Sequence, residues 1–157
     1  MKRIIKLLSL ILMVGLLTGC GKTEKFTFTV ITGDTVTINM DTSTGYTMTS
    51  QVPFKINRSN TTVLTGNFIY MNEYNERINS LDPDAETTKV LETNKHKDNI
   101  TYTLYLSQID GYESDYIYLI KINDSNTGLI LTSMANANRD DVEKAFETLS
   151  ISSTKTS

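Results

Sequence analysis

Two nearly continuous apolar runs in the last third of the chain constrain the fold most. The first covers residues 116–122, the second covers residues 129–134, and six mostly polar residues separate them. Strands that are apolar on both sides are typical of the centre of a sheet whose two faces are both covered. The two runs therefore predict a hairpin of central strands.

Shorter segments predict further strands. Residues 26–30 and 36–40 alternate apolar and polar side chains, as half-buried strands do, and Thr32-Gly33-Asp34 between them predicts a hairpin turn. Further strands are predicted at residues 46–49, 54–56, 63–64, 68–71, 89–93 and 100–106, with a polar turn at residues 94–99. Gly66 inside one β-rich segment predicts a bulge or a sharp bend.

Two segments change to helical spacing. Apolar residues at a period near 3.6 predict a short helix over 72–81 and a clearer one over 140–149, which Asn138 is suited to cap. Residues 150–152 predict a short returning strand. The order indicates an α+β fold, in which a mostly antiparallel sheet carries two helices on one face and an N-terminal β-hairpin extends the domain.

The first twenty residues have the pattern of an export signal. Lys2, Arg3 and Lys6 make a basic start, and residues 7–17 are an apolar run that ends at small residues before Cys20. This arrangement is typical of a secretory signal peptide. The apolar run is too short to span a bilayer as a helix.

The sequence Leu17-Thr18-Gly19-Cys20 resembles the lipobox of bacterial lipoproteins. The resemblance implies cleavage between Gly19 and Cys20 and a diacylglyceryl group on the sulfur of Cys20. It also implies export and anchoring at the extracytoplasmic face of the bacterial membrane. We therefore expect residues 1–19 to be a cleaved signal peptide and 20–25 a lipidated cysteine with a short tether. Residues 26–152 would form a single α+β domain, and residues 153–157 a disordered tail.

The composition of the mature chain limits the number of its domains and the class of its partners. Removal of 19 residues from 157 leaves 138, which suits one domain. Three of the 15 basic residues lie before the cut, so 12 remain against 18 acidic residues, a net charge of −6. This acidity argues against nucleic acid as a partner. Cys20 is the only cysteine, so lipidation leaves none for a disulfide.

The element order from Pro53 onward resembles the PsbP/Mog1-like sandwich. The features that carry this resemblance are the hairpin of residues 116–134, the closing helix 140–149, and Ser150-Ile151-Ser152 behind it. The resemblance implies two helices on a central antiparallel sheet, and the N-terminal hairpin is additional to that pattern.

A second, local match concerns a loop. Residues 33–38, followed by Thr42-Ser43-Thr44-Gly45-Tyr46, resemble the first part of chagasin-type cysteine-protease inhibitors. The Asn-Pro start of the family's loop, its following Trp and its later loops are missing here. If the resemblance holds, it implies that Thr44, Gly45 and Tyr46 contact a protease.

Catalytic and metal-binding patterns are sparse. His96 is the only histidine and lies in the predicted polar turn, and Gly-x-Ser-x-Gly is absent. One histidine and one lipidated cysteine do not make a usual zinc set. The loops that begin at Asp41 and Asp124 share an Asp-x-(Ser/Asn)-Thr-Gly pattern, which is explained either by turn chemistry or by weak Ca²⁺ binding. We expect no metal and no cofactor, and a carboxylate-based hydrolase using Asp41, Asp82, Asp84 or Asp124 is an alternative.

Tyrosines gather in the second half of the chain. One interpretation is that they pack within the sheet. The other is that exposed tyrosines bind a partner, because tyrosine offers a large contact area at low entropy cost. Tyr112 and Tyr116 are the candidates for a partner-binding surface. The expected function is a membrane-anchored cell-envelope lipoprotein, a non-catalytic binding or accessory module for a protein or envelope ligand. A chagasin-like inhibitor is the alternative from the local match.

Overall fold

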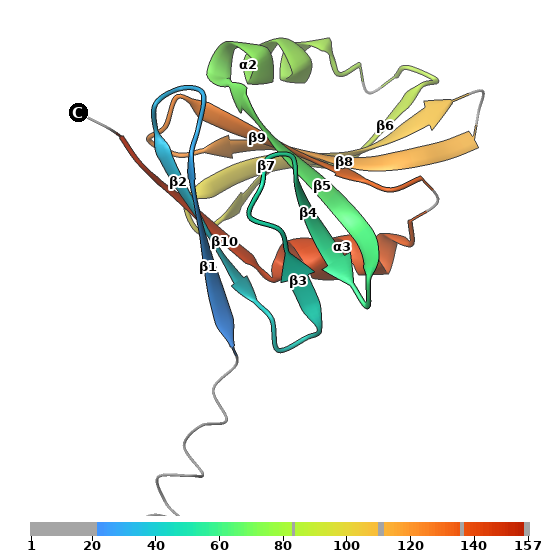
Figure 1. The fold of residues 1–157 in the computed structure, drawn as a ribbon. Helices are drawn as coiled ribbons and strands as arrows, with labels where there is room; N and C mark the ends of the chain where they lie inside the picture. Colours follow the sequence, from blue (N-terminus) through green and yellow to red (C-terminus); the bar gives the residue numbers. More distant parts are fainter. Residues whose placement is uncertain (1–21, 83, 110–111, 136, 156–157) are drawn as a thin grey trace, which may run out of the picture.

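A computed structural model describes residues 22–82, 84–109, 112–135 and 137–155 (Figure 1). The strands of this part of the chain are β1 (Thr23–Thr29), β2 (Thr35–Asp41), β3 (Tyr46–Met48), β4 (Phe54–Arg58), β5 (Thr61–Tyr70), β6 (Thr88–Lys97), β7 (Ile100–Ile109), β8 (Tyr112–Ile122), β9 (Thr127–Ser133) and β10 (Leu149–Thr154). Its helices are α2 (Met71–Ser80) and α3 (Arg139–Glu147).

The strands form two antiparallel sheets. The larger sheet has the order β3-β4-β5-β9-β8-β7-β6, and the smaller has the order β1-β2-β10. The mostly antiparallel α+β class is thus confirmed. Strands β8 and β9 lie inside the larger sheet, as their continuous apolar sequence predicts, and Ile120 and Leu129 pair across them with no exposed surface.

The two helices lie on opposite faces of the larger sheet. Helix α2 packs over β5, β8 and β9, and helix α3 lies on the other side together with the smaller sheet (Figure 1). Leu119 belongs to the apolar cluster under α2, whereas its neighbours Tyr118 and Ile120 belong to the main core. The prediction that both helices cover one face is therefore wrong. The reason is that successive residues of an apolar strand point to opposite faces, and each face needs a cover.

Local sequence explains where α3 begins and which of its faces is buried. The Oδ1 atom of Asn138 accepts a hydrogen bond of 2.8 Å from the backbone N–H of Asp140, as an N-cap should. Val142, Ala145 and Phe146 form the buried stripe of the helix. After the helix the chain turns directly into β10, which pairs with β2.

Several predicted boundaries differ because strand pairing extends into polar sequence. Strand β1 begins at Thr23, which pairs with Asp41, so the predicted tether of residues 20–25 is shorter by three residues. Strand β10 reaches Thr154, which pairs with Thr35, so the first two residues of the predicted tail 153–157 belong to the sheet. Residues 156 and 157 lie outside the described residues.

Strand β6 also extends further than predicted. It runs to Lys97, so His96 lies in this strand opposite Thr101 rather than in a turn. The turn is only Asp98 and Asn99, and Asp98 has a positive φ of 50°, a conformation that aspartate tolerates. Strand β6 is an edge strand of the larger sheet, and none of its side chains is fully buried. Its sequence can therefore be as polar as that of a loop.

The bulge predicted at Gly66 lies elsewhere. Gly66 pairs regularly with Phe54 on one side and with Leu131 on the other. The register of β4 and β5 shifts between Ile56 and Asn57 instead. Gly66 has a packing role, since the ring of Phe54 occupies the space that a side chain at position 66 would need.

Candidate functional site

The loop between β2 and β3, residues 42–45, lies beside the start of the described chain (Figure 1). The backbone N–H and the hydroxyl of Thr42 both donate hydrogen bonds of 2.8 Å to the carbonyl oxygen of Lys22. Strand β1 begins at Thr23, three residues after Cys20. The loop is therefore fastened to the segment that follows the predicted lipidation site.

The conformation of this loop follows from turn chemistry. The Oδ1 atom of Asp41 accepts a hydrogen bond of 2.9 Å from the backbone N–H of Ser43, and the N–H of Gly45 donates to the carbonyl of Thr42. Gly45 has φ +85°, the left-handed region that glycine adopts without strain. Hydrogen bonding from the side chain and backbone of Ser43 lowers the pKa of the Asp41 carboxyl below its ordinary value. The Asp-x-Ser-Thr-Gly pattern is thus accounted for by the turn itself.

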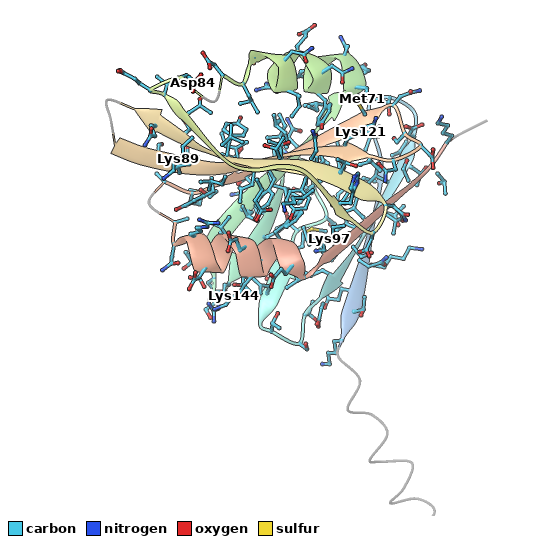
Figure 2. The ribbon with its side chains drawn as sticks, turned by 180° about the vertical axis from the view of Figure 1, so that it is seen from behind. Met71, Asp84, Lys89, Lys97, Lys121 and Lys144 are labelled. Carbon is cyan, nitrogen blue, oxygen red and sulfur yellow. The ribbon has the colours of Figure 1, made fainter. Side chains whose placement is uncertain are left out.

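A cavity of about 270 Å³ opens next to the loop. Its lining comes from β2, the loop, β3, β4 and the end of α3, and consists of Asp41, Thr44, Tyr46, Arg58, Lys144, Glu147 and Thr148. Two cations and two acids line it, so the cavity has no net charge. Figure 2 shows Lys144 near the bottom of the molecule, and Asp84 and Met71 near its top.

Tyr46 is part of the core rather than of the loop surface. Its side chain is 2% exposed, and its hydroxyl donates a 3.3 Å hydrogen bond to the carbonyl oxygen of Asp141 in α3. The guanidinium of Arg58 lies 5.5 Å from the centroid of the Tyr46 ring and forms an ion pair with the Asp141 carboxylate. Burial raises the pKa of the Tyr46 hydroxyl. Tyr46 therefore joins strand β3 to α3.

The structure brings only some of the predicted site residues together. Thr44 and Gly45 are exposed next to the buried Tyr46. Tyr116 lies in β8, four strand spacings from β3 in the sheet, and is half-buried against the main core. Tyr112 begins β8, and its side chain lies outside the described part, as do Gly19 and Cys20. The predicted residues thus form two separate groups.

The predicted acidic candidates do not converge. Asp41 ends β2, Asp82 and Asp84 follow α2, and Asp124 lies in the turn between β8 and β9. The described residues contain no group of three or more His, Cys, Asp or Glu side chains that could hold a metal ion. Within the same residues, no helix is long and apolar enough to cross a membrane.

The residues that sequence reasoning missed are the charged ones around the cavity. Arg58 comes from β4, and Lys144 and Glu147 come from the exposed side of α3. On the sequence they look like ordinary solvated charges. Only the packing of α3 beside the loop brings them to one place.

We compared the chain with protein-family models, curated proteins and solved structures. No protein-family model, no curated protein and no solved structure matches this chain. The likeness to lipoproteins, to PsbP/Mog1-like domains and to chagasin-type inhibitors stays a prediction from the residues quoted above.

Proposed function

We propose that this chain is a membrane-anchored bacterial cell-envelope lipoprotein whose domain binds a protein or envelope ligand without catalysis. The observation that carries the proposal is the basic start, the short apolar run and Leu17-Thr18-Gly19-Cys20 at its end. Two acyl chains on Cys20 would hold the chain at the membrane without a spanning helix.

The short link also orients the domain. An extended chain covers at most about 3.5 Å per residue, so the start of β1 would lie within about 10 Å of the lipidated residue. The loop 42–45 is hydrogen-bonded to Lys22, and it would face the membrane together with the cavity beside it. Helix α2 and the turn between β1 and β2 would point away from the membrane, toward partners (Figure 1).

This orientation counts against the inhibitor alternative. A chagasin-like mechanism needs Thr44, Gly45 and Tyr46 to enter a protease cleft. Tyr46 is almost fully buried, and Thr44 and Gly45 would lie between the domain and the membrane. We therefore keep the binding module as the proposed function. A papain-like protease assay in which the protein inhibits at micromolar concentration would reverse this choice.

The anchor is tested by the variant Cys20→Ala. We expect the wild-type protein to sediment with membranes, and its N-terminal peptide to begin at Cys20 and carry the mass of a diacylglyceryl group. Any processed Cys20→Ala protein should appear in the soluble fraction, because its lipid attachment atom is gone. Ser9→Ala in the apolar run is the control and should behave as wild type. A processed Cys20→Ala protein that still sedimented with membranes would contradict the proposal.

The orientation is tested with single introduced thiols. Lipidation uses the only native cysteine, so Ser43→Cys in the loop and Ser80→Cys at the end of α2 each add one free thiol. Both serines are exposed. A fluorophore at position 43 should be quenched by nitroxide-labelled lipid headgroups, and one at position 80 should not, because the two sites lie at opposite ends. Equal quenching at both positions would rule out this orientation, whereas labelling of the protein without either substitution would show that Cys20 is not lipidated.

A further inference from the structure

A second cavity, of about 290 Å³, lies between α3 and the strands β6, β7 and β8. Its aromatic wall is a packed set of three rings. The rings of Tyr118 and Phe146 are stacked with centroids 4.1 Å apart, and Tyr102 meets Phe146 edge-on at 4.9 Å. Glu92, Glu143, Glu147 and His96 also line the cavity. The cavity therefore combines aromatic faces with acids, and it shares only Glu147 with the cavity at the anchored end.

The cavity already holds one ammonium group, that of Lys97. Figure 2 shows Lys97 between the sheet and α3. Its Nζ atom donates hydrogen bonds of 2.8 Å and 3.1 Å to the carbonyl oxygens of Phe146 and Glu147, and it lies 4.7 Å from the centroid of the Phe146 ring. Carbonyl oxygens at a helix C-terminus and an aromatic face both favour a cation. Burial lowers the pKa of this ammonium group, and the carboxylates of Asp98 and Glu147 oppose that shift.

The charges of the cavity leave room for one more cation. Arg139 donates a 2.7 Å hydrogen bond to the carboxylate of Glu143, and Lys97 balances a second acid. Three carboxylates against these two cations leave one negative charge. Glu92 is half-buried, and no ion pair joins it to any described residue. Glu92 accepts a hydrogen bond from the Tyr102 hydroxyl and lies within the field of Arg139, but it forms no direct ion pair with either cation.

Tyr118 adds a hydroxyl group to the lining of the cavity. Its side chain is 2% exposed, and its hydroxyl has no hydrogen-bond partner within the described ranges. The described chain has no unsatisfied side-chain oxygen that is also sealed from solvent, so the Tyr118 hydroxyl stays accessible from the cavity that it lines. An incoming group could complete its hydrogen bonding.

The two tyrosines stay neutral, and the Tyr102 hydroxyl donates a hydrogen bond to the Glu92 carboxylate. Burial raises the pKa of Tyr102 to about 12, together with the hydrogen bond to Glu92 and the charges of Glu92, Glu143 and Glu147. Burial raises the pKa of Tyr118 in the same direction. Carboxylates that oppose ionisation of the phenols produce a negative field, which attracts a cation.

We propose that this cavity binds a small organic ammonium ion, with the Glu92 carboxylate and the Tyr118 hydroxyl as its polar partners and the ring of Tyr102 beside it. The volume lies just below the usual range of about 300–1,000 Å³ for small-molecule sites, which limits the ligand to the size of ethanolamine or choline. A metal ion fits less well, because no described cluster supplies three or more acidic, His or Cys ligands. The inference names a ligand for the proposed binding module and does not depend on the lipid anchor.

Titration calorimetry of the full-length protein in detergent tests the site. Ethanolamine and choline chlorides are the probes, and glycerol is the neutral comparison. We expect saturable binding of at least one amine and none of glycerol. Glu92→Gln should weaken binding about tenfold or more, since it removes the charge that the ammonium group meets. Tyr118→Phe should weaken it by a smaller factor, because the ring remains and only the hydroxyl is lost.

Glu76→Gln is the matched control. Glu76 is an exposed acid on α2, on the other face of the sheet, and its loss changes the net charge by the same amount. This variant should bind as wild type does. Absence of saturable binding by either amine at tens of millimolar, or equal affinity in Glu92→Gln and wild type, would overturn the proposal. If Tyr118→Phe failed to fold, the Glu92→Gln comparison would still decide, and loss of the lipid anchor would change none of these results.

Discussion

Asp34→Ala should lower the free energy of unfolding by about 3 kcal/mol, because this buried carboxylate joins the two sheets. The side chain is 5% exposed. Its Oδ2 atom accepts hydrogen bonds from the hydroxyl of Ser125 at 2.6 Å, the backbone N–H of Asn126 at 3.0 Å and the hydroxyl of Thr127 at 3.3 Å. Alanine would leave these donors without their acceptor in the interior.

The same residue predicts a dependence on pH. The hydrogen bond from Ser125, and then those from Asn126 and Thr127, lower the pKa of Asp34 despite its burial. A group whose pKa is lowered by folding stabilises the native state above its unfolded pKa of about 3.9, and this stabilisation is lost as the pH falls through the native pKa. The difference between wild type and Asp34→Ala should therefore be full near neutral pH and shrink below about pH 4.

Urea unfolding at a series of pH values measures both effects. Asp124→Asn is the control, since Asp124 lies in the β8–β9 turn beside the donor Ser125 but is exposed, and asparagine tolerates its φ of 58°. This control should change stability by less than about 0.5 kcal/mol. If Asp34→Ala were as stable as wild type at neutral pH, the hydrogen-bonded junction would not contribute to folding.

Gly66→Ala should destabilise the domain by about 2–3 kcal/mol through overpacking. A Cβ atom at position 66 would lie 2.6 Å from Cε1 of Phe54 and closer still to two other atoms of the ring. The ring cannot easily move away, because Phe54 is fully buried and lies 5.5 Å from the ring of Phe28 and 5.8 Å from that of Phe68. Gly66 and Phe54 are cross-strand partners, so the new methyl group would clash with the side chain of its own paired residue.

A double-mutant cycle separates this clash from a general effect of alanine in a strand. Phe54→Leu removes ring atoms that overlap the new methyl group, although it destabilises the domain by itself. In the Phe54→Leu background the cost of Gly66→Ala should fall by about 1 kcal/mol or more, as expected for residues in contact. Equal costs in both backgrounds, measured by urea unfolding, would show that the ring does not set the requirement for glycine.

Local periodicity predicted the elements that bury a whole face or stripe. The central hairpin β8–β9 and the helix α3 with its cap at Asn138 are where the sequence placed them, because burial imposes a period on the residues themselves. Edge strands are different. Strand β6 and the end of β10 carry polar residues, and only their partner strands hold them in a sheet.

The candidate sites show the same division. The sequence by itself determined the prediction of an export signal with lipidation at Cys20, and the turn chemistry around Gly45, since each depends on neighbouring residues. Only the tertiary structure decided that Tyr46 is buried, that the two helices lie on opposite faces, and that Glu92 and Tyr118 line one cavity beside α3. Those residues come from segments far apart in the chain, and their meeting depends on strand order and helix packing, which leave no local pattern.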